Sequence, residues 1–340
     1  MKKEKIPIIE ANGANYNAGY KIGQICRKKI TKLIETSKKR YSSITGQPFE
    51  HFVQRSKKLL APCQRRYAKY IDEIRGITDG ASVNFNEYFA LNFEDEVADF
   101  TYKCTTLFLK TENNTLLGHN EDWTDDFVDK LYILKLKQKD KPSLLFLSYL
   151  GPPQFIISCI NSAGIAFTGN SLYTTHKLGI PEAIMLRSMA DASSVREAIK
   201  DMTARPREMG MNSMIISKNR IVDIENSLNK SAVIEVKGEY FVHTNHPLKL
   251  KGEHSRNSLF RFNRVTERLE NSRKKNVELI KEILSDHKNY PDSVCRHIKN
   301  EEKEMKWATI ASVIIDVGKM RMLVAQGNPC KSRYEEYKLD

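Results

Sequence analysis

A thiol and a carboxyl group that could carry acyl-transfer chemistry lie in the stretch KCTTLFLKTENNTLLGHNEDW, residues 103–123. Cys104 stands directly before an apolar, strand-like run, and Asp122 comes eighteen residues later, after a polar turn and a second apolar run. Two such runs joined by a turn are typical of a β-hairpin. Because the second strand of a hairpin returns beside the first, the sequence predicts that Asp122 lies close to Cys104.

The surroundings of Cys104 favour a reactive thiol over a structural one. A free cysteine is usually a small buried hydrophobe. Here, however, the preceding segment EDEVADFTYK is polar and charged, and two hydroxyl residues, Thr105 and Thr106, follow before the run becomes apolar. Cys104 is therefore a candidate nucleophile at a boundary, and Thr105 and Thr106 are candidate supporting residues.

A thiol nucleophile needs a base, because the thiolate is the reactive form and a free cysteine has a pKa around 8.5. One source is a histidine partner, as in papain-like enzymes, and the candidates are His119, His243 and His246. The other is the α-amino group of Cys104, with a pKa of about 7.7 to 8.0, if Cys104 is the first residue of its chain. The second solution requires cleavage between Lys103 and Cys104, and the residue types leave both solutions open.

The segments before and after Cys104 differ in the spacing of their apolar residues. The first hundred residues space their apolar side chains by three and four, which predicts amphipathic helices. We expect a break at Ala61-Pro62 and a glycine-containing turn at GITDGAS, before a short helix capped by Asn84 or Asn86.

From Cys104 onward, the sequence predicts a meander of strands, two helices, a second set of strands, helices near 257–270 and 275–286, and a final strand pair. This order indicates an α+β fold, and two antiparallel sheets packed face to face with helices outside would bury its apolar faces.

Length and composition are those of a soluble globular protein without internal repeats. The first residues lack the apolar segment of a secretory leader, and no window has the roughly 18 apolar residues of a membrane helix. We therefore expect a cytoplasmic protein with no membrane partner. The six cysteines are scattered, without a C-x-x-C pair or a histidine at zinc spacing, so we expect no disulfide, metal or bound cofactor.

The net charge of +13 would permit binding to nucleic acid or to an anionic substrate such as a coenzyme A thioester. The basic residues, however, are mixed with acids or lie on one face of a predicted helix. We interpret them as solvated faces and expect no nucleic-acid partner.

Five segments in order carry a resemblance to a known family. They are EIRGITDGASVNFNEYFALNFEDE, CTTLFLKTENNTLLGHNEDW with its Gly-x-Asn-x-Asp element, INSAGIAF, VHTNH, and NYPDSVCRH followed by ATIASVIIDV. Over most of its length the sequence resembles the acyl-coenzyme A:6-aminopenicillanic acid acyltransferases, or isopenicillin N acyltransferases, which are cysteine N-terminal nucleophile (Ntn) hydrolases. The resemblance implies an Ntn-hydrolase-like αββα sandwich with a helical N-terminal segment.

The resemblance also implies roles for single residues. Self-cleavage after Lys103 would make Cys104 the nucleophile and the N-terminus of its chain, and Asp122 would be the acid that orients its ammonium. Asn245, in VHTNH, would be the side-chain donor to the oxyanion. Lys306 stands near the position where the penicillin enzyme carries an arginine, and is a candidate supporting residue.

These roles imply a one-unit protein with an α chain of residues 1–103 and a β chain of residues 104–340, in which the cleaved N-terminal chain stays as a partner. The expected activity is acyl transfer through an S-acyl enzyme from a small N-acyl amide, peptide-like bond or acyl thioester, to water or an amine. Two alternatives are an unprocessed Cys-His protease and a basic binding protein without catalysis.

Overall fold

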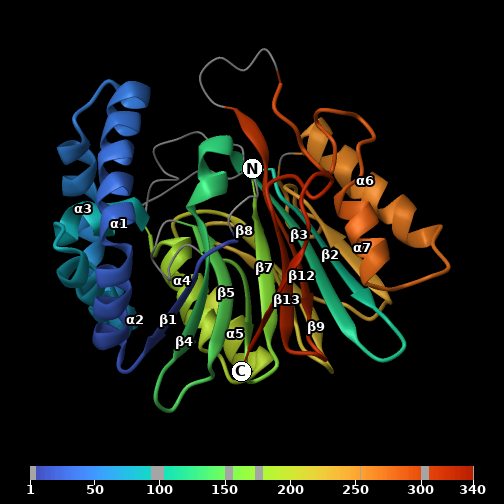
Figure 1. Ribbon diagram of the computed structural model, residues 1–340, viewed down its shortest axis with the longest axis horizontal. Coiled ribbons are helices and arrows are strands. Elements are labelled where there is room, and N and C mark those ends of the chain that lie inside the picture. Colours follow the sequence, from blue (N-terminus) through green and yellow to red (C-terminus); the bar gives the residue numbers. More distant parts are fainter. Residues whose placement is uncertain are drawn as a thin grey trace.

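The computed structural model is a four-layer sandwich in which two β-sheets pack face to face between two layers of helices (Figure 1). The predicted α+β class, with two packed sheets flanked by helices, is confirmed. The structure describes residues 5–92, 103–149, 156–172, 179–252, 254–299 and 306–339.

The first sheet has eight strands in the order β1-β4-β5-β6-β7-β8-β9-β10. All its neighbours are antiparallel except β1, which pairs in parallel with β4 and which the sequence reading missed. The bounds are β1 Ile8–Asn12, β4 Leu131–Lys137, β5 Leu144–Tyr149, β6 Ile156–Asn161, β7 Ala166–Ser171, β8 Met211–Ile216, β9 Ile221–Asn226 and β10 Ser231–Glu235.

The second sheet has six antiparallel strands in the order β11-β2-β3-β12-β13-β14, and its central hairpin β2-β3 is the one predicted after Cys104. The short last strand, β14, was also missed. The bounds are β11 Tyr240–His243, β2 Thr105–Lys110, β3 Thr115–Thr124, β12 Trp307–Asp316, β13 Arg321–Gln326 and β14 Glu335–Lys338.

The two faces of β2 look into different layers, because successive side chains of a strand point to opposite sides. Phe108 belongs to the core between the two sheets, whereas Leu107 and Leu109 pack among residues of the helices α6 and α7. By the same alternation, Thr106 faces the intersheet core and Thr105 faces α6. Residues at the start of β2 can therefore receive partners from both layers.

Helices cover the outer face of each sheet (Figure 1). The first group lies over the eight-stranded sheet, and the second lies over β2, β3 and β11. The first group is α1 Asn15–Thr45, α2 Phe49–Ala81, α3 Phe85–Ala90, α4 Glu182–Ala190 and α5 Val195–Met202; the second is α6 Arg256–Glu270 and α7 Val277–Leu284; a 3-10 helix spans Asp125–Lys130.

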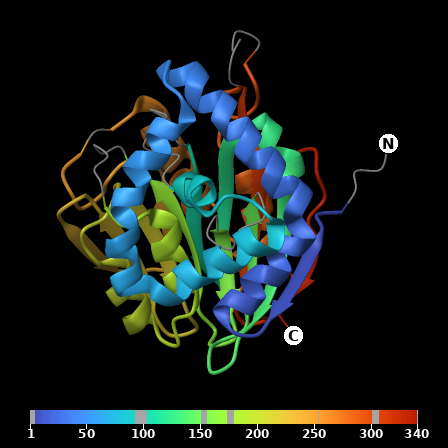
Figure 2. The same ribbon diagram turned by 90° about the vertical axis from the view of Figure 1, so that its left-hand side faces the viewer.

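Four glycines allow α1 and α2 to cross at close range on the face shown in Figure 2. A Cβ atom added at Gly19, Gly23, Gly76 or Gly80 would lie within 2.2 Å of a backbone carbonyl oxygen of the other helix. Glycine in a helix interior costs about 1 kcal/mol relative to alanine, and here the close helix contact is the reason for its presence. The expected turn at GITDGAS was therefore wrong, since these residues belong mostly to the last turns of α2.

The other expectations for the N-terminal segment had mixed outcomes. The break at Ala61-Pro62 is not found: α2 continues through Pro62 and bends at Tyr67, where φ is −127° and ψ is 34°. The cap of the short helix is Asn84, whose side chain accepts hydrogen bonds from the N–H groups of Asn86 and Glu87.

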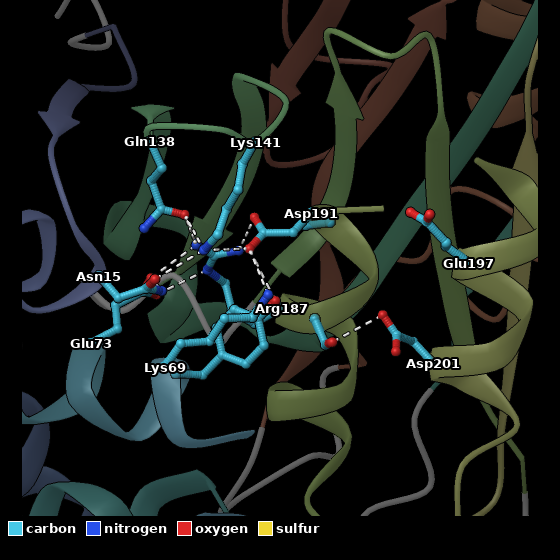
Figure 3. A network of polar contacts seen from close by, with 12 residues as sticks. Asn15, Lys69, Glu73, Gln138, Lys141, Arg187, Asp191, Glu197 and Asp201 are labelled. Carbon is cyan, nitrogen blue, oxygen red and sulfur yellow. Dashed lines mark hydrogen bonds and ion pairs between the residues drawn. The ribbon is translucent and has the colours of Figure 1, made fainter. Parts of the chain in front are cut away.

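A buried ion network joins the N-terminal helices to the rest of the fold (Figure 3). Arg187 on α4 binds both carboxylate oxygens of Glu73 on α2, at 2.9 Å each, and binds Asp191 at 2.7 Å. Lys141 reaches Asp191 at 2.9 Å and Asn15 at 2.9 Å. Burial alone would raise the pKa of Asp191, but the charges of Arg187 and Lys141 outweigh it and lower this pKa to about 2. The network is thus charge-compensated.

In the described part of the chain, no helix is long and apolar enough to cross a membrane.

Candidate active site

The β2-β3 hairpin brings Cys104 and the end of β3 together, as predicted. Its register pairs Thr105 with Asn120, so Cys104 lies beside Glu121 and Asp122. The Sγ atom of Cys104 is 3.4 Å from Oε2 of Glu121, and the backbone N–H of Asp122 donates a hydrogen bond to the same sulfur. The hairpin therefore places a carboxylate and a backbone donor on the candidate nucleophile.

The Cys104 thiol is neutral in this arrangement. Its side chain is buried, with 3% of the residue exposed. Burial raises its pKa well above the ordinary value, and the carboxylates of Glu121 and Asp122 raise it further. A neutral, buried thiol cannot act as a nucleophile until a base takes its proton.

A chain of hydrogen bonds leads from this thiol into the intersheet core. Oε2 of Glu121 lies 3.0 Å from Nε2 of His119, and Nδ1 of the same ring lies 2.9 Å from the Thr106 hydroxyl. Thr106 in turn donates to Asn170 on β7, at 3.0 Å. Glu121 is therefore held in contact with both the thiol and an imidazole, and it can relay a proton between them.

Asp122 is a buried carboxyl group with one unsatisfied oxygen. Its Oδ1 accepts a hydrogen bond from the hydroxyl of Thr309 on β12, at 2.6 Å. Its Oδ2 has no hydrogen-bond partner among the described residues. Burial raises the pKa of Asp122 to about 7, although Arg261 and Thr309 favour the charged form. A cation placed beside Oδ2 would supply the missing partner.

Asn245 and Arg261 complete the site from the opposite side. The amide nitrogen of Asn245 donates one hydrogen bond to the Ser171 carbonyl, at 3.0 Å, and its Oδ1 accepts from Nη2 of Arg261, at 2.7 Å. Nη1 of Arg261 donates to the backbone carbonyl of Cys104, and to the hydroxyl of Thr105 at 2.8 Å. One guanidinium thus fixes the backbone of the candidate nucleophile and the orientation of the Asn245 amide.

The three histidine candidates are distributed differently. His119 lies in the site and is linked to the thiol by two hydrogen-bond contacts through Glu121. His243 points to Glu225, at 3.2 Å, and to Asp223, at 3.8 Å. His246 binds the hydroxyl of Ser258 at 2.8 Å. Of these three, only His119 is linked to the Cys104 thiol through Glu121, whereas His246 is linked through Ser258 to the backbone N–H of Asn245.

The two candidate lysines occupy different places. Lys103 precedes the candidate nucleophile, and its Nζ is 3.7 Å from Asp292. Burial lowers the pKa of Lys103 to about 8, helped by the charge of Arg296. Lys306 is exposed before β12, where its carbonyl accepts from the Asp125 N–H at 2.8 Å. Among the described residues, no contact joins the Lys306 side chain to the site.

Arg261, Glu121 and Thr309 were missed by the sequence reading. Arg261 carried a detectable signal: α6 buries Ser258, Arg261, Val265 and Leu269 along one face, so an arginine stands where the pattern requires an apolar residue. Glu121 and Thr309 carried none, because their roles depend on the pairing of β3 with β2 and β12.

A surface hollow of about 910 Å³ lies elsewhere, over the β2-β3 turn at Lys110–Thr115. This turn is the far end of the hairpin from Cys104. The hollow therefore does not give access to the candidate nucleophile.

Comparison with known proteins identifies relatives of this chain. Residues 109–331 match the family model for acyl-coenzyme A:6-aminopenicillanic acid acyl-transferase. The chain is 27% identical over 341 aligned residues to the 40 kDa form of that acyltransferase from Emericella nidulans, covering 94% of this chain and 92% of the relative. It is 22% identical to a beta-alanyl-dopamine/carcinine hydrolase from Drosophila melanogaster, covering 58% and 57% of the two chains.

Solved structures with lower similarity include a conjugated bile acid hydrolase from Clostridium perfringens, at 13% identity and a TM-score of 0.47, covering 70% of this chain and 97% of that one. A penicillin V acylase from Agrobacterium tumefaciens has 13% identity and a TM-score of 0.45, covering 66% and 82%. The family match spans well over half of the chain. The chain therefore belongs to the acyl-coenzyme A:6-aminopenicillanic acid acyl-transferase family and is an enzyme of the acyltransferase or C–N amide hydrolase class.

Proposed function

We infer that this protein is a self-processing enzyme in which Cys104 becomes an N-terminal nucleophile and carries the acyl group as a thioester. The observation that carries this proposal is the carboxyl of Asp122, buried beside Cys104 with an oxygen that has no hydrogen-bond partner among the described residues. Burying an unpaired carboxylate is costly, and a new ammonium group at Cys104 would remove that cost.

Self-processing begins in the uncut chain, where the nitrogen of Cys104 is an amide and cannot be a base. Glu121, 3.4 Å from Sγ, takes the thiol proton. Sγ forms a bond to the carbonyl carbon of Lys103, the bond from that carbon to the Cys104 nitrogen breaks, and the proton ends on this nitrogen. Water then hydrolyses the thioester, which restores the thiol and leaves Lys103 with a carboxylate.

After cleavage, the α-amino group of Cys104 replaces Glu121 as the base for turnover. A pKa of about 7.7 to 8.0 lets an α-amine accept and return a proton near neutral pH. Its charged form would pair with Asp122, whose pKa is raised by burial in the uncut chain. The buried carboxyl of Asp122, whose Oδ2 has no hydrogen-bond partner among the described residues before cleavage, thus orients the amine after it.

Asn245 is the proposed donor to the oxyanion of the tetrahedral intermediate. One hydrogen of its amide is used by Ser171, and the other remains to be presented to substrate. Because Arg261 holds Oδ1, the amide cannot rotate to present its oxygen instead. Arg261 is therefore a positioning residue, and its charge adds a favourable potential for the developing anion.

The proposed substrate is a small molecule with an N-acyl amide, a peptide-like bond or an acyl thioester. The names of the relatives support this range, since one is an acyl-coenzyme A acyltransferase and another hydrolyses beta-alanyl-dopamine and carcinine. We favour hydrolysis of a small N-acyl amide, with water as the acyl acceptor. The cleaved N-terminal chain would stay bound through the buried Arg187–Glu73 pair, which joins α4 to α2.

Intact mass spectrometry of the purified protein tests this proposal. Wild type should divide from 39.1 kDa into chains of 103 and 237 residues, about 12 and 27 kDa, with Cys104 as a new N-terminus. Cys104→Ala should stay whole, while Cys26→Ala, which changes another buried cysteine, should be cut normally. Glu121→Gln should slow cleavage without changing the cleavage site.

An acyl adduct on the 237-residue chain, trapped with a small amide or thioester substrate, would complete the evidence. The proposal fails if wild type and Cys104→Ala both stay whole and neither forms an adduct. Because the chain belongs to an enzyme family, the alternative of a basic binding protein without catalysis is disfavoured.

The runner-up is an unprocessed enzyme that uses Cys104 with Glu121 and His119 as a relay. The favouring observation is the continuous contact from Sγ to Glu121 and on to His119, at 3.4 and 3.0 Å. In that case the chain would stay whole but active, and His119→Ala would abolish turnover. Under self-processing, His119→Ala instead acts mainly on the rate of cleavage.

A further inference from the structure

Two histidines and two cysteines gather at a place that the proposed reaction does not use. His287, Cys295 and His297 lie between α7 and β12, and Cys330 follows β13. Their four ligand atoms all lie within 4.8 Å of one another. Cys295 and His297 are buried, whereas His287 and Cys330 are exposed, so the cluster opens to solvent on one side.

Four of the six separations among these atoms match the edges of a zinc tetrahedron, and the other two are within 4.8 Å. With Zn–S near 2.3 Å and Zn–N near 2.0 to 2.1 Å, a tetrahedral site has edges of about 3.8 Å between sulfurs, about 3.5 Å from sulfur to nitrogen, and about 3.3 Å between nitrogens. Sγ of Cys295 is 3.6 Å from Sγ of Cys330 and 3.5 Å from Nε2 of His297. Nε2 of His297 is 3.4 Å from Sγ of Cys330 and 3.2 Å from Nε2 of His287.

Hydrogen bonding alone does not account for this convergence. The two Nε2 atoms can share only one proton, and the thiols are weak donors and weak acceptors. The buried acidic cluster of Asp223, Glu225 and His243 is different, because Glu225 already accepts from three backbone N–H groups as well as from His243. Four soft or borderline ligand atoms facing one centre are instead the donor set of a structural zinc site.

We propose that His287, Cys295, His297 and Cys330 bind one zinc ion in a closed, tetrahedral structural site. The sequence reading expected no metal because the four ligands do not follow the compact spacing of known zinc motifs. Seven residues separate the first two ligands, and Cys330 is contributed by the far side of the β12-β13 hairpin. Only the folded sheet brings them together.

The proposed zinc would fix a loop that leads to the active site. Between Cys295 and His297 lies Arg296, whose N–H donates to the hydroxyl of Thr309 at 2.9 Å. That hydroxyl donates to Asp122 at 2.6 Å. Asn328, close to Cys330, donates to the Arg296 carbonyl at 2.6 Å. The metal would therefore stabilise the backbone that positions Thr309 on Asp122, without touching substrate.

Elemental analysis of the untagged, full-length protein tests the proposal without depending on activity. After equilibration with zinc and dialysis, wild type should retain about one equivalent of zinc per chain. Cys104→Ala should retain the same amount, which separates this site from self-processing and from the nearby group Cys104, His119 and Glu121. Cobalt(II) in place of zinc should give the intense visible absorption of tetrahedral thiolate coordination.

Variants of the two exposed ligands, Cys330→Ser and His287→Ala, should lose zinc to a chelator that wild type resists, while Cys26→Ala should behave as wild type. Zinc removal should also speed hydrogen exchange at the Arg296 N–H, because the loop loses its anchor. The proposal is overturned if wild type holds only trace zinc after equilibration. It is equally overturned if non-reduced protein contains a Cys295–Cys330 disulfide instead of zinc.

Discussion

Two buried arginines, Arg187 and Arg261, hold together different parts of this molecule, and they do so with different partners. Both have almost no exposed surface. Arg187 binds the carboxylates of Glu73 and Asp191. The hydrogen bonds that tie Arg261 to the site go to neutral oxygens, those of the Cys104 backbone, the Thr105 hydroxyl and the Asn245 amide.

The difference separates a structural junction from the candidate active site. Around Arg187, carboxylates compensate the positive charge and the network stabilises the junction between α2 and α4 (Figure 3). Around Arg261, hydrogen bonds go to neutral oxygens beside the candidate nucleophile, and the positive potential of the guanidinium also favours the charged form of Asp122. A developing oxyanion benefits from such a potential only if the cation is fixed in place beforehand. At the proposed site, the guanidinium thus fixes neutral groups in place, whereas at the junction it pairs with two carboxylates.

Among the changes that test this comparison, Arg187→Leu should have the largest effect. The change leaves Glu73 buried without its charged partner, so we expect the free energy of unfolding to fall by about 3 to 5 kcal/mol. Urea denaturation followed by circular dichroism measures this loss. Arg220→Leu, which removes an exposed ion pair with Glu235, is the matched control and should cost less than about 1 kcal/mol. Similar losses for the two variants would contradict the structural role of Arg187.

The next effect concerns Asp122 and pH, measured in the uncut Cys104→Ala chain. Its pKa of about 7 in the folded protein lies above the ordinary value of 3.8, so between these values the unfolded chain releases its proton first. Folding stability from this group is therefore fully present below about pH 4 and lost as the pH rises to about 7. The expected loss is on the order of 4 kcal/mol.

Asp122→Asn should remove this part of the pH dependence. The variant and its parent should have similar unfolding free energies near pH 4, and the variant should be the more stable of the two above pH 7. Denaturation curves at several pH values provide the test. Parallel pH profiles for the two chains would mean that Asp122 has a counter-charge already, and the proposed partner role of the Cys104 ammonium would lose its basis.

Features that a short segment specifies could be predicted from the sequence, and features that depend on distant segments could not. The hairpin after Cys104 could be predicted because alternation and a turn specify it within twenty residues. The glycines of α1 and α2 could not be interpreted, because the same GITDG residues fit a turn locally and a close helix crossing in three dimensions. Strand β1 was missed because its pairing partner, β4, lies more than a hundred residues away.

The candidate site followed the same rule. Cys104, Asp122 and Asn245 were proposed from the local sequence pattern and the family resemblance. Arg261 joins the Cys104 carbonyl to the Asn245 amide, and the backbone N–H of Asp122 donates to the Cys104 sulfur. Lys306 was a candidate supporting residue, and its role stays a prediction, whereas Arg261 reaches the site from α6. A guanidinium reaching the site from another layer of the sandwich leaves no signal in the residues next to Cys104.

The smallest expected effect tests whether turnover needs the planar guanidinium of Arg261 in addition to its charge. Lysine keeps the charge but cannot bind the Cys104 carbonyl, Thr105 and Asn245 at once. We therefore expect Arg261→Lys to lower kcat by about tenfold to a hundredfold with little change in KM, because the Asn245 amide loses its fixed orientation. Arg268→Lys, on the same helix in an exposed pair with Glu282, should leave both constants unchanged. If Arg261→Lys instead raised KM alone, we would infer that Arg261 binds substrate directly. The two buried arginines would then differ because Arg261 binds a ligand and Arg187 stabilises the fold.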